Sequence, residues 1–280
     1  MLTIHTIAEV KTQLDTTFHG LSSGFVPTMG ALHEGHLALI RRAARENDFV
    51  TASIFVNPIQ FNNPEDLAKY PRTLEDDLEK LKKAGCNLVF VPEVAEMYPE
   101  PSTTIYDFGM LDKVMEGKFR PGHFNGVAVV VKRLFDIIQP GRAYFGEKDY
   151  QQLQVIKALV RQQDLEVQIV PCATIREPDG LAMSSRNVRL TPEQREAAPC
   201  IYQALKDMRE FASHLSVAES CIRAVKQIEA EGVLTVEYLE VADAYTLLPV
   251  NHWTEASKVI AFIAVHAGSV RLIDNLLIIS

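Results

Sequence analysis

The sequence predicts an α/β protein with a doubly wound parallel sheet, followed by a second, smaller α+β domain. Over about the first 175 residues, short apolar runs rich in β-branched residues alternate with amphipathic segments of helical length. Unusual polar residues come directly after several of these runs. Strands separated by helices of this length indicate βαβ crossovers, and ligands of such sheets bind at the carboxyl ends of the strands.

The predicted strands of the first region are short and apolar, as buried parallel strands are. They cover residues 24–28, 49–56, 87–92, 142–145 and 167–172. Between the first two, Leu37, Ile40 and Ala44 recur at helical spacing. A second amphipathic helix runs through Leu74 and ends near Gly85, and residues 127–139 and 150–163 are predicted to be helical.

The pattern changes after residue 175. A long helix is predicted from Glu193 to about His214, and a second over residues 217–231. Three β-rich runs follow, at 235–242, 259–266 and 270–278. The turn Pro178-Asp-Gly180 marks the hinge between predicted domains 1–175 and 176–280.

Composition limits the function classes. The chain has 280 residues, 47% hydrophobic and 23% charged, with a net charge of −8. This acidic balance excludes a nucleic-acid binder that relies on a basic face, but not a local basic pocket for a nucleotide. No apolar run approaches the roughly 18–20 residues that span a bilayer. The start lacks a signal-peptide layout, and four cysteines without a C-x-x-C pair indicate reduced thiols in a cytoplasmic protein.

Two histidines stand where the first strand turns through Gly30 into a helix that is expected to begin at about Gly35 or His36. His33 and His36 would then lie beside free backbone N–H groups and a positive helix dipole, which attract phosphate. A zinc site is disfavoured, because H-x-x-H lacks the i,i+4 spacing of a zincin helix and has no third ligand nearby. Two surface histidines in a loop remain the alternative.

Three further motifs follow predicted strands or the hinge. Gln60 could bind a small substrate's carboxylate or hydroxyl, Lys148 could pair with phosphate, and Asp149 could accept a hydrogen bond from a ribose hydroxyl. The loop from Met183 to Asn187 offers two hydroxyls and a guanidinium for phosphate oxygens. Solvated turns and a helix cap are the alternatives for all three.

Weaker signals remain elsewhere. Asp76 and Asp77 could hold a magnesium ion, although the sequence favours an acidic pair on an exposed helix face. Arg120 and His123 could add donors to a cleft.

Four motifs in this order resemble one family. The stretch from Pro27 to His36, PTMGALHEGH, is similar to the H-x-G-H element of the class I nucleotidyltransferase superfamily. FVNPIQF at 55–61, FGEKDYQQ at 145–152 and DGLAMSSRN at 179–187 narrow the resemblance to the pantoate–β-alanine ligase (pantothenate synthetase) family. The resemblance is strong to about residue 190 and continues to residue 280 in general character. It implies a Rossmann-like catalytic domain.

The resemblance also implies a reaction. Pantoate's carboxylate would attack the α-phosphate of ATP to give pantoyl-adenylate and pyrophosphate, and β-alanine would then displace AMP to form pantothenate. Mg²⁺ would accompany ATP, and the protein would be a cytoplasmic homodimer without nucleic-acid or membrane partners.

Site residues are carried over by position. His36 would be the catalytic proton donor, Gln60 and Gln152 would bind pantoate, and Gln60 would also bind β-alanine. The implied ATP site comprises Met29, Gly30, Ala31, Leu32, His33, Glu34, Gly35, His36, Gly146, Glu147, Lys148, Asp149, Ile175, Met183, Ser184, Ser185 and Arg186.

Other readings stay open at this point. An adenylyl- or cytidylyltransferase shares H-x-G-H but releases a stable dinucleotide. A tRNA-charging synthetase is disfavoured by a short, acidic chain without an anticodon-binding extension. A nucleotide sensor would not need so many phosphate donors beside two glutamines.

Overall fold

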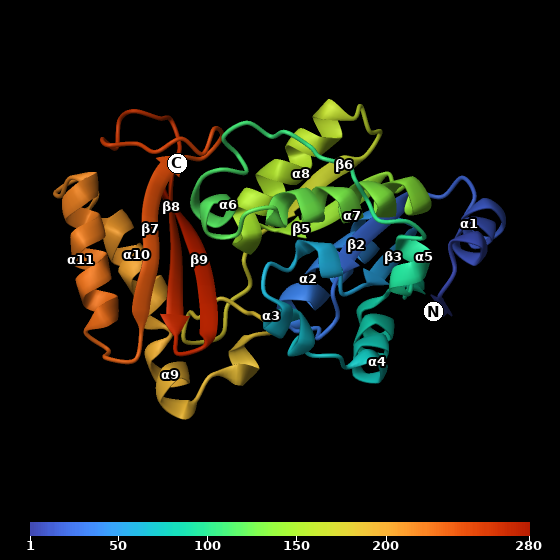
Figure 1. Cartoon of the computed structure of the whole chain (residues 1–280), viewed down its shortest axis with the longest axis horizontal. Coiled ribbons are helices and arrows are strands. Elements are labelled where there is room, and N and C mark those ends of the chain that lie inside the picture. Colours follow the sequence, from blue (N-terminus) through green and yellow to red (C-terminus); the bar gives the residue numbers. More distant parts are fainter. The chain divides into compact units, whose positions relative to one another are not determined.

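The computed structural model describes residues 1–280, which form two compact units (Figure 1). The first unit comprises Met1–Phe108, Arg120–Glu147 and Gln152–Ala173. The second comprises Thr174–Ser280 together with two segments from the middle of the chain, Gly109–Phe119 and Lys148–Gln151. We call Gly109–Phe119 the strap.

The first unit is built on a six-stranded, wholly parallel sheet in the order β1-β4-β3-β2-β5-β6. This confirms the predicted doubly wound fold. The strands are β1 Leu2–Ile4, β2 Ser23–Thr28, β3 Phe49–Ile54, β4 Leu88–Phe90, β5 Arg142–Gly146 and β6 Gln168–Cys172. All five predicted strands are present. The prediction missed β1, because three residues are too few to show a period.

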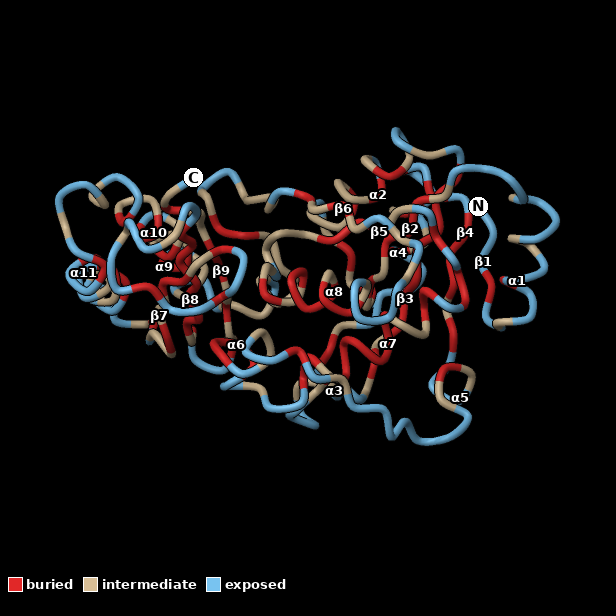
Figure 2. Tube along the Cα trace, turned by 90° about the horizontal axis from the view of Figure 1, so that it is seen from above, coloured by how far each residue is buried: buried red, intermediate tan, exposed pale blue.

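Helices cover both faces of this sheet. On one face α2 (Glu34–Glu46) and α4 (Leu74–Ala84) bury Ile40 and Leu81 in a core that includes Val26 of β2. Neighbouring residues of a strand point to opposite faces, so Phe25 packs edge-on against Phe135 of α7 (His123–Ile138). Helix α7 is buried along most of its length (Figure 2). The other helices are α1 Ile7–Thr16, α3 Pro64–Ala68, α5 Val94–Met97 and α8 Tyr150–Gln162, which begins in the second unit.

The second unit pairs a three-stranded antiparallel sheet with helices, as predicted. Its strands are β7 Thr235–Asp243, β8 Val259–Ala267 and β9 Val270–Ile279, in the order β7-β8-β9. Strand β9 is therefore an edge strand. Helices α10 (Cys200–Phe211) and α11 (Val217–Glu229) pack on one face, while α6 (Met115–Phe119) in the strap belongs to the core on the other.

The single helix predicted from Glu193 to His214 is wrong. The chain forms α9 (Pro192–Ala197) and then α10, which begins after Pro199. Proline has no N–H and its ring clashes with the preceding turn, so one straight helix cannot pass through this position. Helix α7 also begins at His123, four residues before its predicted start. None of the helices combines the length and apolar character needed to cross a bilayer.

Candidate active site

The turn after β2 is held by a carboxylate from α4. Gly30 and Ala31 both have positive φ, of 80° and 50°, a conformation that costs energy for alanine. The two carboxylate oxygens of Asp77 accept hydrogen bonds from the backbone N–H groups of Ala31 and Leu32, at 2.8 and 2.7 Å. Lys80 donates to the carbonyl of Leu32 at 2.9 Å. One turn of α4 therefore fixes the backbone directly before the histidines.

The two histidines cap α2. His33 is the N-cap residue, and its Nδ1 accepts a hydrogen bond from the N–H of Gly35 at 3.2 Å. His36 Nδ1 in turn accepts from the N–H of His33 at 3.4 Å, and the two rings lie 4.1 Å apart. A ring nitrogen that accepts a hydrogen bond carries no proton, so each neutral imidazole bears its proton on Nε2. The predicted position at a helix N-terminus is confirmed, with the helix beginning at Glu34.

Polar residues follow β2, β3 and β5, as the sequence predicts. Strand β2 continues to β3 on one side, whereas β5 lies on its other side, so the winding reverses between β2 and β5. Ligands of doubly wound sheets bind at this switch point. Met29–Leu32 follow β2, and Gly146 ends β5 immediately before Glu147. Both sets of predicted ATP-binding residues in the first unit thus flank the switch point.

Gln60 is buried and already oriented by protein groups. Its Oε1 accepts a hydrogen bond from Asn57 Nδ2 at 3.0 Å, and its Nε2 lies 3.1 Å from the sulfur of Met29. Asn57 also donates to the carbonyl of Gly126, and its Oδ1 accepts from the hydroxyl of Tyr98 at 2.9 Å. Burial raises the pKa of Tyr98, so this hydroxyl stays a donor.

Helix α7 supports the same turn. His123 Nδ1 donates to the carbonyl of Gln60 at 2.8 Å, while the Arg120 guanidinium donates to His123 Nε2 at 3.1 Å. A Cβ at Gly126 would lie 2.5 Å from the carbonyl oxygen of Ile59, so only glycine allows this approach. The sequence singled out Arg120 and His123 as possible donors to a cleft; in the structure their hydrogen bonds support the Gln60 turn.

The sequence predicted a role for some of the other residues of this region and not for others. Asn57 lies in the FVNPIQF motif but was given no role of its own, and Tyr98 carried no signal beyond its residue type. Gln152, a predicted pantoate ligand, lies half-buried on α8 of the first unit.

The predicted phosphate loop of the second unit, residues 183–187, follows a small hairpin. Arg176 and Ala182 form an antiparallel β-bridge, and the N–H of Met183 donates to the carbonyl of Ile175 at 3.0 Å. The turn between them contains Gly180, which has a φ of 99°. The hairpin delivers Met183 into the segment that continues with Ser184, Ser185 and Arg186. These residues are all half-buried.

Lys148 and Ser184 line one small cavity in the second unit, together with Asn187. Lys148 is 19% exposed and its Nζ lies 4.0 Å from the neighbouring Asp149. The structure thus brings together an ammonium, a hydroxyl and an amide from two of the predicted motifs.

Gln151 secures the strap. Its Nε2 donates to the carbonyls of Leu111 and Val114, both at 2.8 Å, and its Oε1 accepts from the N–H of Glu116 at 3.0 Å. Glu116 is held further by two hydrogen bonds from the Arg271 guanidinium. This buried glutamine, close to Lys148 in the chain, thus has a structural task that the motif alone does not show.

Asp76 and Asp77 differ in their surroundings. Asp76 is exposed, whereas Asp77 is 1% exposed and engaged with backbone N–H groups. No group of three or more His, Cys, Asp or Glu side chains is arranged to hold a metal ion. The assignment of magnesium to these two residues stays a prediction.

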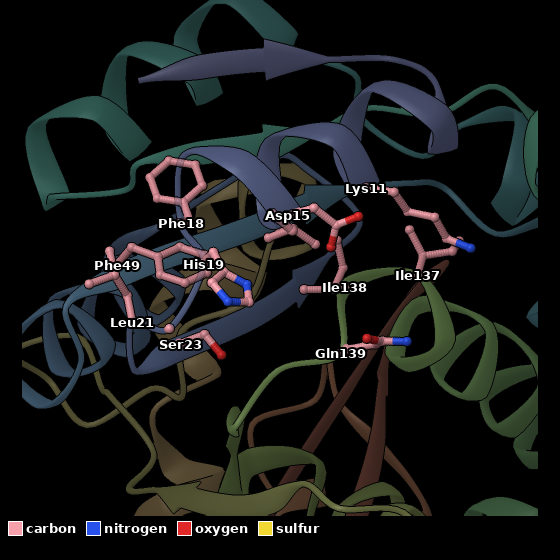
Figure 3. Close-up of a pocket in the computed structure, with 12 residues that line it drawn as sticks. Lys11, Asp15, Phe18, His19, Leu21, Ser23, Phe49, Ile137, Ile138 and Gln139 are labelled. Carbon is pink, nitrogen blue, oxygen red and sulfur yellow. The ribbon is translucent and has the colours of Figure 1, made fainter.

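A pocket of about 270 Å³ lies in the first unit, at the end of the sheet opposite the predicted site (Figure 3). Ser23 and Phe49, which begin β2 and β3, line it together with Ile138 at the end of α7. It therefore lies at the amino ends of the strands and contains none of the predicted site residues. Phe18 stacks on Phe49 at its border.

A family model described as pantoate-beta-alanine ligase matches residues 2–277. A pantothenate synthetase of Bacteroides fragilis is 48% identical over 277 residues, covering 99% of this chain and 98% of the relative. One of Bacteroides thetaiotaomicron is 49% identical over the same length, with the same coverage.

Solved structures give the same result. The pantothenate synthetase of Thermus thermophilus superposes with a TM-score of 0.92 at 48% identity, covering 100% of both chains. The pantoate-beta-alanine ligase of Francisella tularensis, complexed with beta-gamma ATP and beta-alanine, has a TM-score of 0.85 at 36% identity and covers 99% of this chain and 98% of that one.

Proposed function

Because the chain belongs to the pantoate–β-alanine ligase family, we propose that it condenses pantoate with β-alanine, using ATP, through a pantoyl-adenylate. The observation that carries the proposal is the pair of imidazoles that cap α2, His33 and His36, whose Nδ1 atoms accept backbone N–H groups and leave Nε2 as the donor atom. They follow β2 at the switch point of the sheet, and Met29 of the same loop contacts the oriented Gln60.

In the first step a pantoate carboxylate oxygen attacks the α-phosphorus. The bond between that phosphorus and the oxygen bridging to the β-phosphate breaks, and pyrophosphate leaves with the electron pair. Nε2–H donors at a helix N-terminus stabilise the negative charge that develops on the phosphate oxygens. We assign His36 as the proton donor and His33 as a second phosphate ligand.

The remaining donors fall into two sets, one for the phosphates of ATP and one for pantoate. Lys148, Ser184, Ser185 and Arg186 neutralise phosphate charge, which is the main task in phosphoryl displacement. We assign pantoate to Gln60 and Gln152, because a neutral amide can donate to a carboxylate and accept from a hydroxyl. The amide of Gln60 is already fixed by Asn57, so it need not be ordered when the substrate binds.

In the second step the amine of β-alanine attacks the acyl carbon of the adenylate. The C–O bond to the phosphate breaks, AMP leaves, and the nitrogen loses one proton as the amide forms. We assign the β-alanine site to the neighbourhood of Gln60. Magnesium enters as the complex with ATP, because Mg²⁺ keeps several waters and needs few protein ligands when phosphates bind it.

Pantoate-dependent exchange of pyrophosphate into ATP, without β-alanine, tests the proposal. Exchange is expected, because adenylate formation is reversible. Absence of exchange, or release of ADP during full turnover, would contradict an adenylate intermediate. A stable dinucleotide product from a phosphorylated substrate would favour the adenylyl- or cytidylyltransferase alternative.

A homodimer and a cytoplasmic location are further parts of the proposal. The four cysteines, Cys86, Cys172, Cys200 and Cys221, are all free thiols, as is usual in a reducing compartment. Light scattering after size-exclusion chromatography measures the oligomeric state directly. A mass equal to that of one chain, 31.3 kDa, would contradict the dimer.

A further inference from the structure

We propose that Asp274 and Asn275 of β9 are positioning residues that hold the two phosphate-binding segments of the second unit in one fixed arrangement. One segment carries Lys148, and the other is the hairpin that delivers Met183 to Arg186. The proposal rests on the proposed function, which assigns both segments to ATP.

The two residues are neighbours on an edge strand, so their side chains point to opposite faces of the sheet. Leu272 belongs to the core that faces α10, whereas Ile273 packs with the core on the strap side. Asp274 and Asn275 continue this alternation. Both are buried, at 5% and 8% exposure, on a strand whose other buried residues are apolar. Buried polar side chains on a strand need a specific reason, because burial without partners costs free energy.

Asn275 holds the lysine segment. Its Nδ2 donates to the backbone carbonyl of Lys148 at 2.8 Å, across 127 positions of the sequence. Its own N–H donates to Oδ1 of Asp274 at 2.8 Å, which links the two anchors. The Lys148 backbone is therefore attached to β9 at the residue that provides the ammonium.

Asp274 holds the hairpin through Arg176. The guanidinium donates to both carboxylate oxygens, at 2.6 and 2.9 Å, in the bidentate geometry that restricts orientation most strongly. The same guanidinium donates to the carbonyl of Gly180 at 3.1 Å and stacks on the ring of Tyr202 at 3.6 Å. Arg176 thus clamps the hairpin and its turn against β9.

One of the two anchors lies beside the donors that the anchors position. Asp274, Lys148 and Ser184 line the same small cavity. The buried ion pair contributes little net stability, because two buried charges lose hydration that their attraction only partly returns. An apolar pair of similar volume would stabilise the sheet equally well. What such a pair cannot provide is a fixed geometry between two loops, and this is the role that we assign to the anchors.

Two near-isosteric variants test the role. Asn275→Leu removes the donor to Lys148, and Asp274→Asn removes the bidentate charge pair. Each is expected to raise the KM for ATP about tenfold, the equivalent of one lost hydrogen bond to a charged or buried group. The KM for pantoate is expected to stay within about twofold, because the glutamines assigned to pantoate lie in the first unit and make none of the lost contacts.

Glu237→Gln is the matched control. It weakens another ion pair to β9, between Glu237 and Arg271, with side-chain exposures of 22% and 21%. This control is expected to lower the melting temperature and leave the KM for ATP unchanged. Should Asn275→Leu and Asp274→Asn behave like the control, with lower melting temperatures and an unchanged KM for ATP, the anchors are structural and the proposal fails.

A second substitution and a measurement of ATP binding cover the case in which Asp274→Asn does not fold. If Asp274→Asn does not fold, Arg176→Lys keeps the charge but loses the bidentate contact, and the same rise in KM is expected. Calorimetric titration of the full chain with ATP alone is the independent readout. Wild-type protein that binds ATP without pantoate-dependent exchange would refute the proposed function but not the anchors. Equal ATP affinity of the wild type and Asn275→Leu would refute the anchors alone.

Discussion

The two units fix their phosphate donors in different ways. In the first unit the donors stand on a helix N-terminus, and the side chains that hold the turn come from the same α/β layer, with Asp77 of α4 accepting from Ala31 and Leu32. In the second unit the donors stand on loops. Their anchors, Asp274 and Asn275, lie 98 and 127 positions from their partners along the chain.

The difference shows where each geometry is encoded. A helix cap is a local device, because the residues that satisfy its N–H groups lie within four positions of one another. A loop clamped by a distant strand is a tertiary device. A substitution in the helix cap should therefore change mainly kcat. A substitution in the anchors of the loops should change mainly the KM for ATP. Four measurements test this contrast.

The largest effect is expected at His36. His36→Ala removes one Nε2–H donor and should lower kcat by about 10²–10³-fold, the loss typical of removing one transition-state donor. The melting temperature should change little, because the ring is a half-buried cap. Steady-state kinetics with saturating substrates measures the effect. His19→Ala is the control, because His19 lines the pocket at the amino ends of the strands, and it should keep wild-type kcat. A near-normal kcat for His36→Ala would remove His36 from the chemistry.

The next effect concerns stability in the second unit. Gln151→Ala removes the hydrogen bonds that the side chain makes to the Leu111 carbonyl and the Glu116 N–H, and one of those to the Val114 carbonyl, which keeps the bond from the Gly117 N–H. It should lower the free energy of unfolding by about 2–3 kcal/mol. Urea titration followed by circular dichroism measures this loss. Gln162→Ala removes a single exposed hydrogen bond, to the carbonyl of Asp107, and should cost less than about 0.5 kcal/mol. Equal losses would show that the strap does not depend on Gln151.

Asp77→Asn tests the contacts from α4 that hold the turn directly before the cap. One of its two backbone contacts must be lost, because an amide has a single acceptor oxygen, and the turn before His33 loosens. We expect kcat to fall about tenfold, with the Mg²⁺ concentration for half-maximal rate unchanged. Asp76→Asn, at the exposed neighbour, should behave like wild type. A changed Mg²⁺ requirement in either variant would instead support the predicted metal site.

The smallest effect is a pH dependence at the hairpin. Burial raises the pKa of Asp179, but hydrogen bonds from Arg195 and from the N–H of Leu181 outweigh it and lower the pKa overall. A carboxyl with a lowered folded-state pKa stabilises the protein above its unfolded value of about 3.9, and this contribution disappears as the pH falls through the folded value. The melting temperature of Asp179→Asn should therefore lie below that of wild type at about pH 6, and the gap should close as the pH falls below the unfolded value of about 3.9. A gap independent of pH would exclude the charge as its cause.

The predictability of the fold followed the length of each signal. Strands and helices with several periodic residues were mostly recognised, including α2 through Leu37 and Ile40. The ten-residue α1 was missed, because Val10 is its single buried residue and gives no apolar stripe. The three-residue β1 and the short helices α3, α5 and α6 offered too few positions to show a period. Pro199 was a visible helix breaker, but the apolar periodicity on both sides of it favoured one continuous helix.

The site followed a different rule. The sequence predicted which side chains would carry donors, because histidines at a glycine turn and a Ser-Ser-Arg loop have recognisable chemistry. It could not predict what holds them. Asp77 looked like one of two exposed acids, and only the packing of α4 shows that one is buried and the other is not. Asn275 lies in an ordinary apolar strand sequence, and its partner is a backbone carbonyl that carries no residue signature.

The distance between Lys148 and Asn275 along the chain has a kinetic consequence. A contact across 127 positions closes a long loop, and such contacts form late because their entropy cost precedes any gain. The contact from Asp77 to Ala31 spans only 46 positions. During refolding, the histidine turn can therefore form before β9 is in place, whereas the lysine segment cannot. We expect ATP to accelerate none of the early phases and to stabilise only the species that appears last, so that recovery of nucleotide binding reports the final docking of β9.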